Sequence, residues 1–430
     1  MNTIVSNRIN TLDKLSRLSV VIWACMLVLF GTYIRSRPGD MIPETDWLII
    51  AQISISIFGG ILGILLMLRQ CMNIRLGAKV LFAYLVTTAF SAVFSPYSKI
   101  VIGYWFLLFG TSLLTLGIVQ RAKTLKDLER IEKIWLITIS LSLLKDTFIA
   151  LFFPELIEIQ VNDEPFRLGI GLTHANEMSI LASVAFWISF KKDKLKYPII
   201  LWVFRLFFIL IIMLSRSRVS LTCLLIGGVI WFWFQDTSQS KQGLKRIVIF
   251  CTLFSIIITG ILISSIELPG VNSLLNYLNR GQDVNTIMSL TGRTEIWSFA
   301  INKIFNGPIS FLGGHGYGVT KLVLNDEGIL PFYAYHCHNA FLETFFGVGL
   351  LGFIPFVVLL FYSTSWLHNF KKLSRVYSSE FALHAVTIVS IVLTNSITES
   401  YISMKVNPII VIYLFYILAL DRKQSLNNLS

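Results

Sequence analysis

The sequence contains little charge and few cysteines for its length. Only 14% of its 430 residues are charged, and 24 acidic residues stand against 36 lysines and arginines. Its 5 cysteines form no C-x-x-C pair, so the common zinc-ribbon spacing is excluded and no disulfide framework is indicated. The basic residues lie in short clusters between apolar runs. We therefore expect them to face anionic lipid, and we expect no nucleic-acid partner.

Long apolar segments take the place of the missing charge. Hydrophobic residues make up 55% of the chain, and the mean hydropathy is +0.71. Because a helix needs about 20 apolar residues to cross a bilayer, each long run is a candidate span. We interpret the first run as a retained span because no small-residue cleavage site follows it. The runs cover residues 18–34, 47–68, 78–95, 100–119, 134–153, 177–190, 198–214, 219–235, 247–266, 346–366, 381–396 and 405–420.

These runs predict an all-α integral membrane protein, a polytopic bundle of about twelve transmembrane helices. Lysine and arginine gather in every loop on the side of the amino terminus, which predicts that both termini are cytoplasmic. Residues 1–266 would form the first nine helices, residues 267–345 one large periplasmic loop, and residues 346–430 the last three helices and a cytoplasmic tail. A loop of this length is expected to carry function.

Four arginines stand out on the predicted external side, namely Arg167, Arg216, Arg218 and Arg293. The guanidinium fork binds phosphate through two parallel hydrogen bonds and stays charged when it is partly desolvated. An external anion site is one interpretation. Each arginine can also be an interfacial anchor that reaches the lipid headgroups.

Histidines mark the end of the large loop. His336 and His338 precede the tenth predicted span, and an imidazole there can act as a general base. They can also be structural, or form a zinc pair, although no further ligands are evident and we expect no metal. The segment "FLGGHGYGVT" carries His315 and Tyr317 among glycines, whose backbone amides can cradle an anion or simply form a tight turn.

These segments together resemble the O-antigen ligase and O-antigen polymerase family of bacterial inner-membrane glycosyltransferases. The resemblance covers roughly residues 165–355 and depends on the order of four short motifs on one side of the membrane. They are "RLGIGLTHANEM" from Arg167 to Met178, the pair Ser217-Arg218, Gly292-Arg293 with Glu295 to Trp297 and the following "GGHGYG" turn, and His338-Asn339 followed by Gly349-Leu350-Leu351-Gly352.

The resemblance implies a GT-C-like helical fold that transfers a glycan from undecaprenyl diphosphate without a nucleotide sugar, a cofactor or a metal. Arg218 and Arg293 would bind the diphosphate and stabilise the leaving group. His338 would accept the proton of the attacking hydroxyl, although His336 competes for this role. Other residues would line the donor or acceptor groove, and they are Arg167, His174, Asn176, Arg216, His315, Tyr317, His336 and Asn339.

Three functions stay open at this stage. A ligase would transfer finished O-antigen to the lipid A core, whereas a polymerase would join one lipid-linked repeat to another. A transporter of lipid-linked glycans would also suit many spans and a basic cavity, but the sequence has no two related halves. A transporter should tolerate His338→Ala, whereas an enzyme that uses His338 should not.

Overall fold

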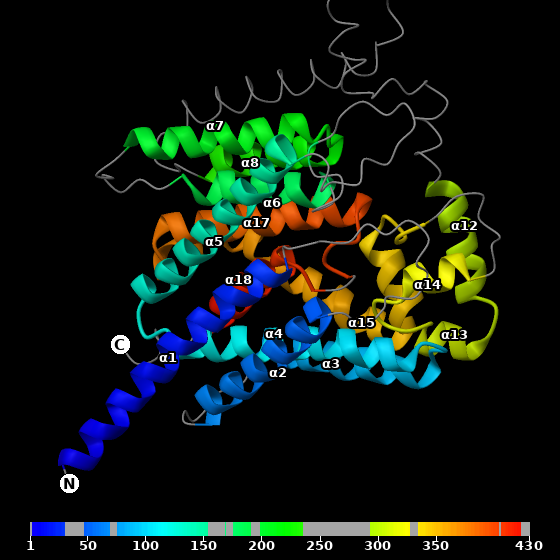
Figure 1. Cartoon of the computed structure of the whole chain (residues 1–430), viewed down its shortest axis with the longest axis horizontal. Coiled ribbons are helices and arrows are strands. Elements are labelled where there is room, and N and C mark those ends of the chain that lie inside the picture. The colour runs from blue at the N-terminus through cyan, green and yellow to red at the C-terminus, as the bar shows by residue number, and fades with distance from the viewer. Residues whose placement is uncertain are drawn as a thin grey trace, which may run out of the picture.

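The computed structural model describes residues 2–30, 47–68, 75–153, 168, 175–190, 198–234, 293–326, 334–403 and 406–422. This part of the chain is helical, without a β-strand (Figure 1). The helices are α1 (Asn2–Phe30), α2 (Trp47–Leu68), α3 (Leu76–Phe94), α4 (Ser98–Arg121), α5 (Leu125–Phe152), α6 (Ala175–Ile188), α7 (Pro198–Leu214), α8 (Arg218–Phe234), α12 (Arg293–Ile304), α13 (Pro308–Gly313), α14 (Thr320–Asn325), α15 (Ala340–His368), α16 (Phe370–Val376), α17 (Ser379–Thr398) and α18 (Pro408–Arg422).

The predicted spans coincide with helices wherever the structure describes them. In the described residues, six helices are long and apolar enough to cross a membrane, and α1, α6, α7, α8 and α18 contribute shorter apolar helices. The prediction of a multi-pass, all-α membrane protein is therefore confirmed. The predicted span at residues 247–266 lies outside the described residues, so the count of about twelve spans stays a prediction.

Small residues bring α2 and α4 into close contact. Gly63 of α2 lies against the backbone of Leu113, and Gly110 of α4 lies against the backbone of Ser56, so neither position has room for a Cβ atom. Lipid is as apolar as the side chains, so membrane helices associate through close packing of this kind. α18, by contrast, is surrounded by other helices, and its apolar residues from Ile409 to Leu420 are all buried.

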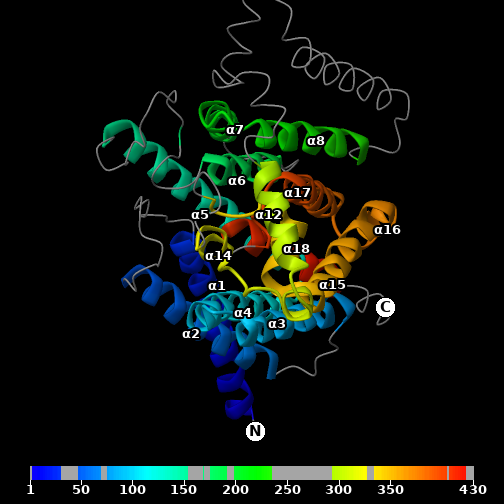
Figure 2. The ribbon, with the colours of Figure 1, turned by 90° about the vertical axis from the view of Figure 1, so that its right-hand side faces the viewer.

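The short helices α12, α13 and α14 gather at one end of the bundle, and α1 begins toward the other end (Figures 1 and 2). α13 packs against α15, which is kinked at Gly349 with φ +62°. A Cβ atom at Gly349 would collide with the backbone of Leu312, so only glycine fits this kink. The kink at Gly349 therefore lets α13 pack closely against α15.

Candidate active site

The site is built around Glu399, which follows the last residue of α17 and has no exposed surface. One carboxylate oxygen, Oε1, accepts a hydrogen bond from Asn176 Nδ2 at 2.8 Å and from Arg293 Nη2 at 3.2 Å. The other oxygen, Oε2, lies 3.2 Å from His338 Nδ1 and 3.9 Å from His336 Nε2. We call these five residues the Glu399 cluster.

Helix ends hold the members of the Glu399 cluster in place. Asn176 lies in the first turn of α6, and Arg293 is the first residue of α12. Arg293 also donates a hydrogen bond from Nη1 to the carbonyl of Thr398 at 2.8 Å, so its guanidinium binds two consecutive residues at the end of α17. Two contacts to one helix end fix the guanidinium plane and leave further N–H donors for a ligand.

Glu399 is ionised in this setting. Burial opposes the charge, but the hydrogen bond from His338 and the positive charges of His338, His336 and Arg293 outweigh it and lower the pKa of Glu399 to about 2. A carboxylate only accepts hydrogen bonds, so His338 donates its Nδ1–H to Glu399. The second ring nitrogen of His338, Nε2, is then unprotonated in the neutral ring and can accept a proton.

His336 uses its two nitrogens differently. Its Nδ1 accepts a hydrogen bond from the backbone N–H of His338 at 3.0 Å, so its Nε2 carries the proton of the neutral ring. His336 is buried, whereas about a quarter of the His338 side chain is exposed. His338 has a positive φ of +49°, which is uncommon for a residue other than glycine. The buried His336 ring supports the turn that presents His338.

His336, His338 and Glu399 also form a group with the composition of a metal site, since one ligand atom of each lies within 4.8 Å of the others. A ligating nitrogen must be unprotonated. Nε2 of His336 carries a proton because Nδ1 accepts a hydrogen bond, and Nδ1 of His338 carries the proton donated to Glu399. The three side chains form an ionic cluster with these proton positions, and they would have to lose both protons to hold a metal through these atoms.

Arg218 begins α8 next to the Glu399 cluster. Ser217 caps α8, because its Oγ accepts from the backbone N–H of Ser220 at 3.4 Å. Arg218 is half-buried, and the positive charge of Arg293 acts on it. Its guanidinium has no hydrogen-bond or ion-pair partner within the described residues. A helix amino terminus attracts anions, so a site for a negatively charged group at Arg218, Arg293 and the first amides of α8 stays a prediction that this arrangement suits.

The structure places the other predicted residues at varying distances from this centre. Arg216 occupies the turn before α8 with a positive φ of +49°, and its N–H binds the carbonyl of Met213. Arg167 and His174 lie outside the described residues. Leu168 is described, and it is buried and donates a backbone hydrogen bond to the carbonyl of Leu214, the last residue of α7.

The glycine-rich turn supports α15. The backbone N–H of His315 binds the carbonyl of Phe346, and that of Gly316 binds the carbonyl of Gly347 at 2.7 Å. Tyr317 is buried in the hydrophobic core, and burial lowers the pKa of His315. The contacts observed for His315 and Tyr317 are thus structural, and a role for them in substrate binding stays a prediction.

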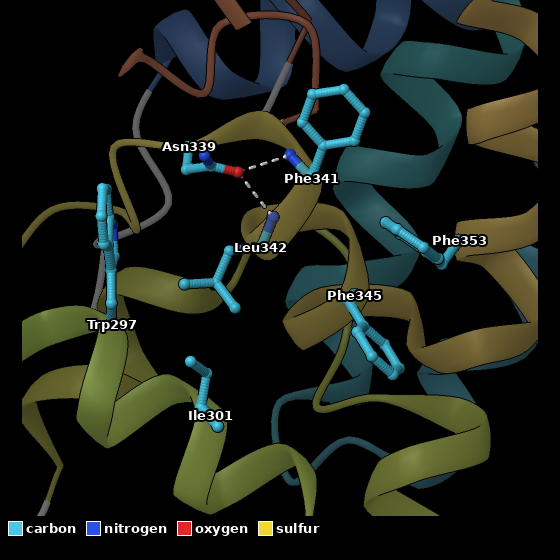
Figure 3. Close-up of a pocket in the computed structure, with 7 residues that line it drawn as sticks. All are labelled: Trp297, Ile301, Asn339, Phe341, Leu342, Phe345 and Phe353. Carbon is cyan, nitrogen blue, oxygen red and sulfur yellow. Dashed lines mark hydrogen bonds between the residues drawn. The ribbon is translucent and has the colours of Figure 1, made fainter. Parts of the chain in front are cut away.

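Asn339 caps the amino terminus of α15. Its Oδ1 accepts hydrogen bonds from the backbone of Phe341 and Leu342, both at 3.0 Å (Figure 3). Its Nδ2 donates to the carbonyl of Ile397, and its backbone N–H donates to Ser400 Oγ. Asn339 therefore ties the start of α15 to the end of α17 and places His338 beside Glu399.

The sequence analysis did not identify Glu399. Its signal was present, because Glu399 is the only acidic residue in the predicted external connection between residues 397 and 404, on the same side as the selected arginines and histidines. Trp297 was noticed only as part of a motif. Its Nε1 donates to the carbonyl of Cys337 at 2.7 Å and thereby joins α12 to the His336–His338 segment.

These features define a class of protein first: a multi-pass helical membrane protein with a preorganised cluster of ionised groups and histidines at one end of its bundle. Residues 203–357 match the family model described as O-antigen ligase. The predicted resemblance to this family is therefore confirmed over the matched segment, which is about a third of the chain. The matched segment contains Arg218, Arg293, His336 and His338, whereas Asn176 and Glu399 lie outside it. No curated protein matches the chain.

Proposed function

We propose that this protein is an inner-membrane glycosyltransferase that transfers a glycan from undecaprenyl diphosphate to an acceptor hydroxyl on the periplasmic face, with the lipid A core as acceptor. One observation carries the proposal. The half-buried guanidinium of Arg218 stands unpaired among the described residues, close to Arg293, whose partner Glu399 also holds His338. The two arginines suit a diphosphate, and the histidine suits a hydroxyl that needs deprotonation.

His338 is the proposed base. Its Nε2 is unprotonated in the neutral ring because Nδ1 donates to Glu399, whereas Nδ1 of His336 accepts a backbone N–H and Nε2 of His336 then carries the proton. Glu399 would stabilise the imidazolium that forms when His338 takes the proton. Glu399 acts through His338 and is a positioning residue.

The reaction balances without a co-reactant. The acceptor oxygen bonds to the anomeric carbon of the glycan as its proton moves to His338 Nε2. The bond between the anomeric carbon and the phosphate oxygen breaks, and undecaprenyl diphosphate leaves with the electron pair. Arg218 and Arg293 stabilise the charge that develops on this leaving group. A GT-C-like bundle with its site at the membrane surface would leave the distal part of the polyprenyl tail in lipid.

The decisive experiment is an assay of the purified protein in nanodiscs with an undecaprenyl-diphosphate-linked glycan from its own host. Lipid A core and a second lipid-linked repeat are offered separately as acceptors. Transfer to the core supports a ligase, and growth of a ladder on the lipid carrier shows a polymerase instead. Use of neither acceptor contradicts the proposal and favours transport. A parallel assay in EDTA tests the expected independence from metal.

The proposed site requires α12 to face the periplasm. In a protein without its native cysteines, Asn306→Cys near the exposed end of α12 should react with an impermeant thiol reagent added outside the inner membrane. Lys372→Cys on α16 should react only after the membrane is permeabilised, because the lysine and arginine clusters are expected on the cytoplasmic side. Both side chains are exposed, so access to the reagent depends on the side of the membrane. The reverse labelling pattern would place the site in the cytoplasm.

Glu399→Gln is expected to lower transfer at the optimal pH by about 10- to 100-fold, the loss that follows removal of a charged hydrogen bond. Initial transfer rates at saturating donor measure the loss.

The matched control is Glu295→Gln, an exposed position on α12 two residues from Arg293. It should leave the transfer rate unchanged. The melting temperature is a second measurement, which tests whether Glu399 only stabilises the fold. Because the pKa of Glu399 falls from 4.5 to about 2 on folding, its charge stabilises the fold above about pH 4.5, and this contribution disappears as the pH falls toward 2. If Glu399 were structural only, Glu399→Gln would lower the melting temperature but leave the transfer rate of the folded protein unchanged.

A further inference from the structure

An apolar groove lies directly beside the Glu399 cluster, between α12 and the first turns of α15. Its volume is about 290 Å³, and apart from Asn339 its walls are hydrophobic. Trp297 and Ile301 project from α12 toward Leu342 and Phe345 of α15 (Figure 3). The groove would suit a hydrocarbon chain.

The groove and the ionic site share their walls. Arg293, Trp297 and Ile301 are spaced four residues apart and lie along one face of α12, about 12 Å from first to last. Arg293 holds Glu399, and Trp297 binds the carbonyl between the two histidines. Asn339, which follows His338, lines the same groove. If the charged end of a ligand binds at Arg293, the part of the ligand next to that end would therefore lie in the groove.

The far wall of the groove is aromatic. Phe345 stacks on Phe353 with ring centroids 5.1 Å apart, and it contacts Phe311 and Phe305 at 5.5 Å and 6.3 Å. Phe305 is 63% exposed, and Ile301 at the rim is 46% exposed. Exposed apolar side chains on an external helix indicate contact with the outer part of the bilayer. The groove thus runs from the ionic site toward lipid.

We propose that this groove binds the polyprenyl tail of the lipid-linked donor next to its diphosphate, and that it selects donors by their lipid. This inference rests on the proposed function, because it assumes a diphosphate at Arg218 and Arg293. A branched, unsaturated isoprenoid chain packs well against aromatic rings. The acyl chains of a lipid acceptor are the competing occupant, but the groove begins at the residues that hold the diphosphate.

The variant Ile301→Trp fills the groove from its exposed rim without adding charge. In nanodiscs it should raise the KM for an undecaprenyl donor about fivefold and leave the KM for a geranyl donor unchanged. The effect is modest because the tail exchanges one apolar environment for another, and packing alone is lost. Ile301→Gln, which keeps the groove open but makes its rim polar, should act in the same direction.

The matched control is Val86→Trp. Val86 lines a second apolar groove of about 320 Å³ between α3 and α4, whose lining residues include none of the Glu399 cluster. This control should change neither KM. An unchanged KM for both donors in Ile301→Trp would overturn the inference, and so would an equal rise for both donors or a change only in the KM for the acceptor.

A binding measurement separates this inference from the proposed function. Photoreactive undecaprenyl diphosphate without a glycan should label peptides of α12 and of the first turns of α15 in the wild type, and Ile301→Trp should reduce that labelling. If the wild type transfers no glycan but is labelled there, the proposed transferase function fails and the groove stands. If it transfers glycan but is not labelled there, the groove assignment fails.

Discussion

Replacing His338 with alanine is expected to reduce glycan transfer by about 10²- to 10⁴-fold, the usual contribution of a positioned general base. The KM for the donor should change little, because Arg218 and Arg293 remain. The acceptor hydroxyl would lose its proton acceptor, and His336 cannot replace it, since its Nδ1 accepts a backbone N–H and its Nε2 carries the proton of the neutral ring. Initial rates in nanodiscs at saturating donor measure the effect.

Three variants show whether the imidazole of His338 itself is responsible. His338→Gly removes the strain of a positive φ, so it should fold at least as well as His338→Ala and be equally inactive. His336→Ala should cause a smaller loss. His368→Ala, at the exposed last residue of α15, should have full activity. Full transfer activity in His338→Ala would show that His338 is not the base, and recovery in His338→Gly would mean that only the backbone shape matters.

Replacing Arg218 with alanine should lower the rate of transfer by about 10²- to 10³-fold, as found when one donor to a developing anion is removed. Arg218 has no protein partner in the described residues, so its half-buried charge is available to the diphosphate. Arg293 alone cannot compensate, because Glu399 neutralises much of its charge. Arg218→Lys should recover only part of the activity, since an ammonium keeps the charge but lacks the planar fork.

Arg216→Ala is the matched control for Arg218→Ala, because both arginines belong to the same short turn. Arg216 lies within the turn, whereas Arg218 is the first residue of α8 and interacts electrostatically with Arg293. We expect a loss of less than about tenfold for Arg216→Ala. Equal losses in both variants would mean that the turn attracts the donor as a diffuse patch of charge. No loss in either variant would show that the diphosphate does not bind at this turn.

Hydropathy predicted the helices well because a chain in lipid must satisfy its backbone polar groups internally. The ranges 47–68 and 198–214 coincide with α2 and α7, and errors elsewhere arose where polar turns extend a helix beyond the bilayer. α5 begins at Leu125 rather than near residue 134, since Thr124 and Asp127 form a capping box ahead of the apolar run. α15 begins at Ala340 for the same kind of reason, with Asn339 as its cap.

The predicted external side and the family resemblance together singled out Arg218, Arg293 and His338 in the sequence. They could not select Glu399, because the carboxylate meets Arg293 across 106 residues of chain and His338 across 61. Nor could they separate substrate-binding residues from structural ones. Asn339 and the amides around His315 had the composition of a binding loop, and their observed contacts are a helix cap and a supporting turn.

The sequence by itself determined that this protein is a helical membrane protein and which residues of chemical interest share one of its sides. Both follow from local properties, namely the length of each apolar run and the positions of charge between runs. Only the tertiary structure decided which histidine has a free nitrogen, since that depends on the hydrogen bonds that Glu399 and a neighbouring backbone amide make. It also decided where an apolar groove meets the ionic cluster, because α12 and α15 form that groove only when they pack together.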